Sequence, residues 1–109
     1  MSNSPAPGMI HTVYFWLTPG LSDADFMSFV DGCKSLSTVP VVQRYYGGTG
    51  AGTPARDGVT QKDYDYSIHL FFASVEDHNT YQDHPVHLAF VDQHASKFAT
   101  VRVYDNVID

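Results

Sequence analysis

A short segment between two helical patterns holds the side chains best suited to chemistry. It contains Tyr81, His84, Pro85 and His87. Pro85 prevents a continuous helix, so the chain must turn here. An imidazole can accept or donate a proton near neutral pH, and a nearby phenol can donate a hydrogen bond. The segment therefore predicts a place where a small molecule could be held and made to react.

His87 and Tyr81 are the candidate catalytic pair. As a general base, His87 must lie within ~2.6–3.2 Å of the proton that it removes, with its other ring nitrogen fixed by a hydrogen bond. The Tyr81 hydroxyl could stabilise a developing enolate. Two alternatives stay open: His87 packs over Phe90 and Val91 with its ring bonded to a backbone carbonyl or to His11, and Tyr81 only anchors its helix.

His84 and His87 could bind a divalent metal with His11 as a third ligand, because imidazoles three residues apart can share a helix face. Pro85 disturbs that spacing, and no cysteine or paired carboxylate supplies a fourth ligand. The sequence therefore predicts no metal. His84 is instead expected to cap the end of the preceding helix.

The remaining histidines are expected to take different places. His69 alternates with the apolar side chains of its strand, on the side of Ser67 and Phe71, and is expected to line the interior near His87. His78 and His94 are expected at the surface of their helices.

The elements that would position these residues follow the order β-α-β-β-α-β. Four strands are predicted at residues 10–18, 41–46, 64–73 and 100–105. One helix is predicted from Ser22 to about Ser37, and a helical region interrupted at Pro85 follows Ser74. The glycine-rich segment 47–58 is predicted to be a long mobile loop, without the Gly-Lys-Ser/Thr ending of a phosphate loop. This order predicts an α+β, ferredoxin-like fold with a four-stranded antiparallel sheet.

The strands are apolar on both sides, whereas two helices can cover only one face of a sheet. Ile10, Tyr14, Trp16 and the alternating apolar side chains of 64–72 are expected on the uncovered face. A second copy that packs sheet against sheet would cover it. The sequence therefore predicts a homodimer with a barrel-like core.

Composition excludes several partners. The chain has 109 residues and a formal charge of −6, which repels nucleic acid and anionic lipid. The apolar run from Met9 to Leu17 is too short to span a bilayer. Residues 1–8 lack the features of a secretory signal. They are expected to be a disordered tail ahead of one domain, 9–109. Cys33 is the only cysteine, which is compatible with the cytoplasm, and its helical context predicts a buried thiol.

Four segments resemble the stress-responsive α/β-barrel (Dabb) family, and the resemblance covers about residues 9–109. They are Ile10 to Val13, Phe72 to Glu76, Tyr81 to Phe90 and Val101 to Asp105. The tyrosine followed by His-Pro-x-His is the most specific of these, and an early strand histidine with a late aspartate agrees. The resemblance implies a ferredoxin-like protomer that dimerises through its sheet into an α/β barrel.

The resemblance also implies candidate site residues. A plant member of the family closes a linear polyketide by an intramolecular aldol reaction without a cofactor, and its catalytic pair falls on Tyr81 and His87. A pocket histidine on its first strand falls on His11, whereas another falls on Tyr66 here. The loop 47–58 is different and longer.

Two functions follow as hypotheses. The first is a cofactor-free cyclase, lyase or isomerase acting on a carbonyl compound, with one pocket per subunit. The second is a non-catalytic, stress-responsive dimer; a cofactor-free monooxygenase rests on analogy of fold alone. Candidate ligand-binding residues are His11, Tyr66, His69, His84 and Phe90.

Overall fold

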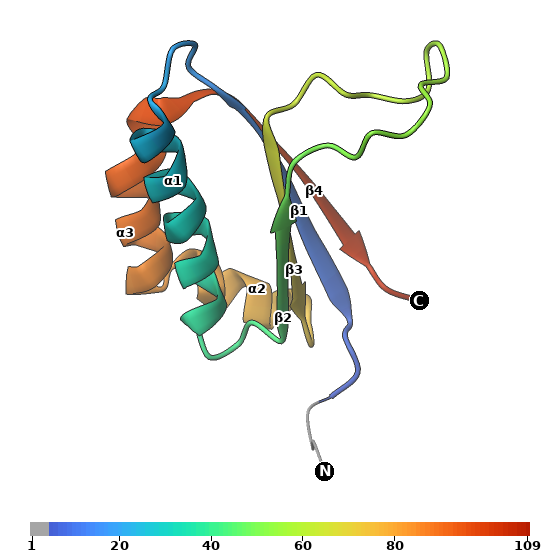
Figure 1. Ribbon diagram of the computed structural model, residues 1–109. Coiled ribbons are helices and arrows are strands. Elements are labelled where there is room, and N and C mark those ends of the chain that lie inside the picture. Colours follow the sequence, from blue (N-terminus) through green and yellow to red (C-terminus); the bar gives the residue numbers. More distant parts are fainter. Residues whose placement is uncertain (1–4) are drawn as a thin grey trace.

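The computed structural model describes residues 5–109 and has two layers, with helices on one side of a four-stranded sheet (Figure 1). The strands are β1 (Met9–Leu17), β2 (Arg44–Gly48), β3 (Tyr66–Phe72) and β4 (Phe98–Val107). The helices are α1 (Asp23–Ser35), α2 (Val75–Gln82) and α3 (Pro85–His94), and one 3-10 turn follows α1 and another follows α3.

All neighbouring strands are antiparallel, in the order β2-β3-β1-β4. This is the order of the ferredoxin-like fold, so the predicted fold class is confirmed. Within residues 5–109, no helix is both long enough and apolar enough to cross a membrane.

Hydroxyl caps fix where two of the helices begin. The Ser22 Oγ accepts a hydrogen bond from the Asp25 backbone N–H at 3.1 Å, and the Ser74 Oγ accepts one from that of Asp77 at 3.1 Å. Each cap satisfies one of the backbone donors that a helix start leaves without a partner. Both starts agree with the sequence prediction.

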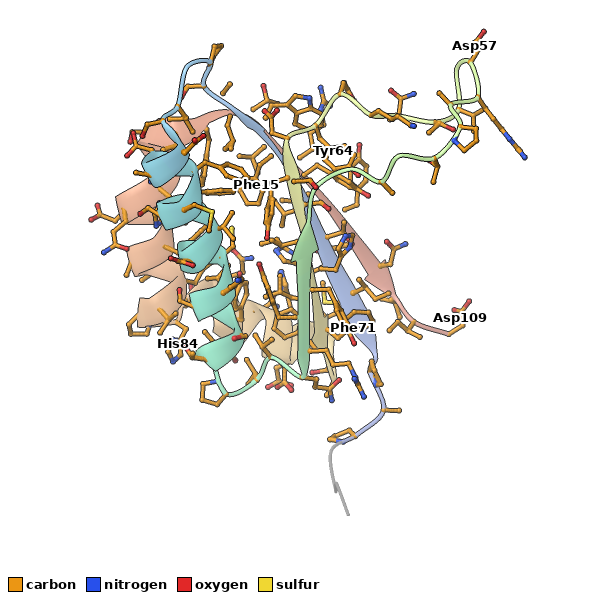
Figure 2. The ribbon with its side chains drawn as sticks, in the orientation of Figure 1. Phe15, Asp57, Tyr64, Phe71, His84 and Asp109 are labelled. Carbon is orange, nitrogen blue, oxygen red and sulfur yellow. The ribbon has the colours of Figure 1, made fainter. Side chains whose placement is uncertain are left out.

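The inner face of the sheet packs against the helices. On β1, Met9, His11, Val13 and Phe15 are buried, as the alternation of that strand predicts. The Phe15 ring lies 5.1 Å from Phe29 of α1 between centroids, within the layer that separates sheet and helices (Figure 2). This layer is the core of the protomer.

The predicted orientation of β3 is wrong. Tyr66, Ile68, Leu70 and Phe72 are buried on the inner face, whereas Ser67, His69 and Phe71 lie on the outer face. The register explains this, because Val13 pairs with Ile68 and paired residues of neighbouring strands share a face. The side chains that β3 contributes to the outer face are therefore more polar than predicted.

Several strand boundaries also differ from prediction, including the start of β3 at Tyr66 and not at 64. β2 begins at Arg44 and continues through Gly47 and Gly48, so the irregular segment between β2 and β3, which we call the arm, is 49–65. Figure 1 shows the arm extending away from the sheet on the side opposite the helices. β4 begins at Phe98, two residues before the predicted start at 100.

The expected tail, 1–8, falls partly on residues 1–4, which lie outside the described residues. Gly8 extends the sheet: its N–H donates to the Phe72 carbonyl, and its carbonyl accepts from the Ile108 N–H, each at 2.8 Å.

Candidate active site

The turn between α2 and α3 is stabilised by His84. The His84 Nδ1 accepts a hydrogen bond from the Val86 backbone N–H at 3.1 Å, so His84 is the N-cap of α3. The prediction that it caps the preceding helix is therefore wrong. Pro85 occupies the first turn of α3, where the missing N–H costs nothing because no partner exists there.

His87 lies in the first turn of α3 and bonds back to α2. Its Nδ1 lies 2.9 Å from the Gln82 carbonyl oxygen. Since a carbonyl can only accept, Nδ1 donates, and the lone pair of the neutral ring is on Nε2. Burial lowers the pKa of His87, and the Gln82 hydrogen bond opposes this in part. The ring is therefore neutral at pH 7, the form that can accept a proton.

Tyr81 is at the centre of the arrangement. Its side chain is 1% exposed, and its ring centroid lies 4.8 Å from that of His87 and 5.9 Å from that of His11. Burial raises the pKa of the Tyr81 phenol. The group therefore stays protonated and is suited to donate a hydrogen bond.

His11 is paired with Asp105 on the neighbouring strand. The two residues are directly opposite in the register of β1 and β4, and His11 Nδ1 lies 2.5 Å from an Asp105 carboxylate oxygen. Burial lowers the pKa of His11, and the hydrogen bond to Asp105 acts in the opposite direction. The carboxylate fixes the orientation of the buried ring.

His78 also belongs to this group, and the prediction that it lies at the surface is wrong. It is 9% exposed, and its ring centroid lies 4.7 Å from that of His11. His78 precedes Tyr81 by three residues, so both lie on one face of α2. This three-residue spacing is visible in the sequence and indicates that His78 lies beside Tyr81. We call His11, His78, Tyr81, His87 and Asp105 the histidine cluster.

Two members of this cluster belong to one row of residues across the inner face of the sheet. The register aligns Tyr45 of β2, Leu70 of β3, His11 of β1 and Asp105 of β4. The Tyr45 hydroxyl oxygen is buried and lies close to that of Tyr66, since a Cβ atom on Gly47 would be 2.5 Å from the first and 2.8 Å from the second. Its neighbouring phenol is therefore that of Tyr66, outside the histidine cluster.

The other candidate residues lie elsewhere. His69 is on the outer face, 3.3 Å from the Thr12 hydroxyl, so it does not share the interior with His87. Tyr66 packs against Phe26 and Phe29 of α1. Phe90 packs in the core beside His94, which is buried and not at the surface as predicted. The structure therefore brings together His11, Tyr81 and His87, but not Tyr66, His69, His84 or Phe90.

Two hollows lie on other parts of the described surface. The larger, about 790 Å³, lies between the arm and the outer face and is lined by residues that include Tyr14, Trp16, Tyr64 and Tyr104. The smaller, about 350 Å³, lies near Thr18, Asp23 and Phe26. Neither is lined by the histidine cluster.

Comparison with solved structures finds the same fold in proteins of several descriptions. A Dabb family protein with a ferredoxin-like fold from Mesorhizobium loti is 30% identical, with a TM-score of 0.73, and the match covers 94% of this chain and 98% of that one. A dimeric ferredoxin-like protein of unknown function from Thermobifida fusca is 18% identical, with a TM-score of 0.76 and coverages of 94% and 92%. Hydroxynitrile lyase from Passiflora edulis is 19% identical, with a TM-score of 0.79 and coverages of 95% and 96%.

The sequence comparisons identify the family of this chain. A search of curated proteins found no match. The family model described as the Stress responsive A/B Barrel Domain, Dabb, matches residues 9–108, nearly the whole chain. The chain therefore belongs to the Dabb family.

Proposed function

We propose that this protein is a cofactor-independent enzyme that removes a proton α to a carbonyl group, with His87 as the base and Tyr81 as the hydrogen-bond donor. The observation that carries the proposal is the hydrogen bond from His87 Nδ1 to the Gln82 carbonyl beside the buried Tyr81 ring. This bond fixes the tautomer that a base requires, with Nε2 free to accept the proton.

The chemistry balances with these groups alone. His87 Nε2 takes the proton, and the electron pair of the C–H bond becomes an enolate whose oxygen accepts a hydrogen bond from Tyr81. The enolate carbon attacks a second carbonyl of the same molecule, and a C–C bond forms. The imidazolium of His87 returns its proton to the new alkoxide, which completes an intramolecular aldol reaction.

The His11–Asp105 pair supports binding of an oxygen-containing compound, because the Asp105 side chain is 40% exposed and the His11 ring lies beside that of Tyr81. Small-molecule sites in proteins commonly combine an apolar lining with a few polar groups. A hydroxynitrile lyase has the same fold, so the fold is compatible with an enzyme site.

We further propose that two copies associate through the outer face of the sheet. Tyr104 is 55% exposed there, and Tyr14 and Trp16 lie on the same face. Two of the similar solved proteins are described as dimeric with a ferredoxin-like fold, which supports this arrangement.

Exchange of α-protons tests the proposed step directly. The protein is mixed with phenylacetone in deuterium oxide, and loss of the α-proton signals is followed by NMR. We expect exchange above the buffer rate, reduced ~10²–10⁴-fold in His87→Gln and reduced in Tyr81→Phe. His69→Ala, which changes an imidazole on the outer face, is the matched control and should retain the rate.

Variants at His87 also distinguish the enzyme from a non-catalytic dimer. A thermal-shift screen of aryl ketones should raise the unfolding temperature of the wild type but not of His87→Ala. Exchange at the buffer rate, together with no ligand-dependent shift, would contradict the enzyme and favour the non-catalytic dimer.

A further inference from the structure

Three members of the histidine cluster form a set of groups that bind metals in other proteins. His11, His78 and Asp105 each offer one ligand atom, and these atoms all lie within 4.8 Å of one another. This set differs from His84, His87 and His11, which the sequence analysis considered. Neither His78 nor Asp105 has a role in the proton transfer proposed above.

The three side chains come from separate elements that the fold holds rigidly together. His11 is in β1, Asp105 is opposite it in β4, and His78 is in α2, where the Ser74 cap fixes the helix start four residues earlier. His11 and His78 are buried, whereas the Asp105 side chain is 40% exposed. The set is therefore preformed, and an ion can enter from the side of Asp105.

The donor types indicate which ions would bind. Two imidazoles and one carboxylate suit zinc and other divalent first-row transition metals, whereas magnesium and calcium prefer oxygen ligands. Three protein ligands leave at least one coordination position for water. Ligand atoms ~2.0–2.2 Å from a tetrahedral zinc are ~3.4 Å apart. His11 Nδ1 and the Asp105 oxygen now lie 2.5 Å apart in a hydrogen bond, so ligation through these atoms would move them apart and release the Nδ1 proton to solvent.

The hydrogen bonds around His78 favour a metal ligand. His78 Nδ1 lies 3.0 Å from the Asn79 Oδ1, an oxygen that can only accept, so Nδ1 donates and Nε2 carries the lone pair. The Gln82 side-chain amide, at 3.3 Å, donates to this lone pair and would be displaced when a metal binds. Ligating histidines usually donate their second ring N–H to an oxygen in this way. Asn79 would therefore act as a positioning residue for His78.

From this geometry we infer a binding site for one divalent transition-metal ion per chain, with His11, His78 and Asp105 as its protein ligands. The inference is independent of the proposed enzyme activity, because a metal can be measured without any substrate.

Calorimetric titration with Zn²⁺ tests the site. Untagged protein is first treated with a chelator and dialysed. We expect one ion per chain, with affinity lowered more than ~100-fold in Asp105→Asn and in His78→Gln and ~10–100-fold in Asn79→Ala. His69→Ala should bind as the wild type does. Co²⁺ should give the visible absorption bands of a four-coordinate site in the wild type and lose them in Asp105→Asn.

Several outcomes would overturn the site. These are no saturable Zn²⁺ binding, equal binding in Asp105→Asn and the wild type, an equal loss in His69→Ala, or binding of Mg²⁺ with the same affinity as Zn²⁺. Circular dichroism checks that each variant is folded. Asp105 is partly exposed, so Asp105→Asn decides the question even if His78→Gln is unstable.

Discussion

The inner and outer faces of the same sheet differ in how completely they are packed. On the inner face, Phe72 and Leu70 are fully buried beneath the helices of the same chain. On the outer face, Tyr46 and Tyr104 are each 55% exposed, and aromatic rings contact one another across neighbouring strands, as Tyr14 does with Tyr104 at 6.0 Å. The inner face is therefore covered by helices of the same chain, whereas the outer face of the single chain leaves apolar surface exposed.

Replacing adjacent residues of β3 gives the largest expected effect. Phe72→Ala removes a fully buried ring and should lower the free energy of unfolding by ~3–5 kcal/mol. Phe71→Ala removes the next ring along the strand, on the outer face, and should cost clearly less. Chemical denaturation measures both. Equal losses would mean that the two faces do not differ in packing.

A charge on the outer face should separate the proposed dimer. Tyr104→Asp places a carboxylate on an exposed position of β4, so the protomer should fold normally while the dissociation constant of the dimer rises at least ~100-fold. Met27→Asp, at an exposed position on α1, is the control. Sedimentation equilibrium gives the dimer dissociation constants of the two variants. A dimer that tolerates Tyr104→Asp would show that its interface lies elsewhere.

Two glycines test how tightly the inner layer is packed. A Cβ atom on Gly32 of α1 would lie 2.4 Å from the His94 Nε2, whereas one on Gly48 would meet nothing within 4 Å. Gly32→Ala should therefore destabilise by ~1–3 kcal/mol, although alanine is normally the better helix former. Gly48→Ala should not introduce a clash. Thermal unfolding of the two variants measures the contrast, and stabilisation by Gly32→Ala would contradict the packing described here.

The smallest expected effect is on how the free energy of unfolding depends on pH. Burial lowers the pKa of His94 from 6.5, and Lys97 lowers it further. The unfolded chain then binds more protons than the folded chain at mildly acidic pH. The stability from neutral His94 is therefore present above pH ~6.5 and is lost as pH falls through the lowered pKa.

The variant His94→Gln isolates this contribution. Its free energy of unfolding should vary with pH less steeply than that of the wild type, by at most ~1.4 kcal/mol per pH unit. Urea titrations at pH 5, 6, 7 and 8 give the slopes. Parallel curves would mean that His94 titrates alike in the folded and unfolded chains. The outer-face variant His69→Gln provides a comparison, because burial also lowers the pKa of His69.

Sequence reasoning identified the fold and the alternation of β1, because strand and helix periodicities are local properties. It did not orient β3 correctly, because both faces of the sheet were expected to be apolar, and only pairing with Val13 and His11 decides that the apolar set Ile68, Leu70 and Phe72 faces the helices. The end of β2 also depends on strand pairing. Glycine weakens a strand locally, but pairing of Gly47 with Ile68 keeps the strand intact.

Part of the candidate site followed from the sequence as well. The short distance from Tyr81 to His87 depends on one helix junction and was predictable. The burial of His94 was not, and that of His78 was indicated only by its spacing from Tyr81, because a histidine can be buried where neighbouring polar groups satisfy its ring nitrogens, here Asn79 and Gln82 for His78 and Lys97 for His94. Such partners are visible only after the chain has folded.

The buried thiol of Cys33 has a practical consequence for spectroscopy. Cys33 is the only cysteine, it is fully buried, and burial raises its pKa to about 12, so it reacts slowly with maleimides at neutral pH. Asp57 lies at the tip of the arm, far from the helices (Figure 2). A dye or spin label attached through Asp57→Cys would therefore occupy a single position on each molecule, without removal of the native sulfur.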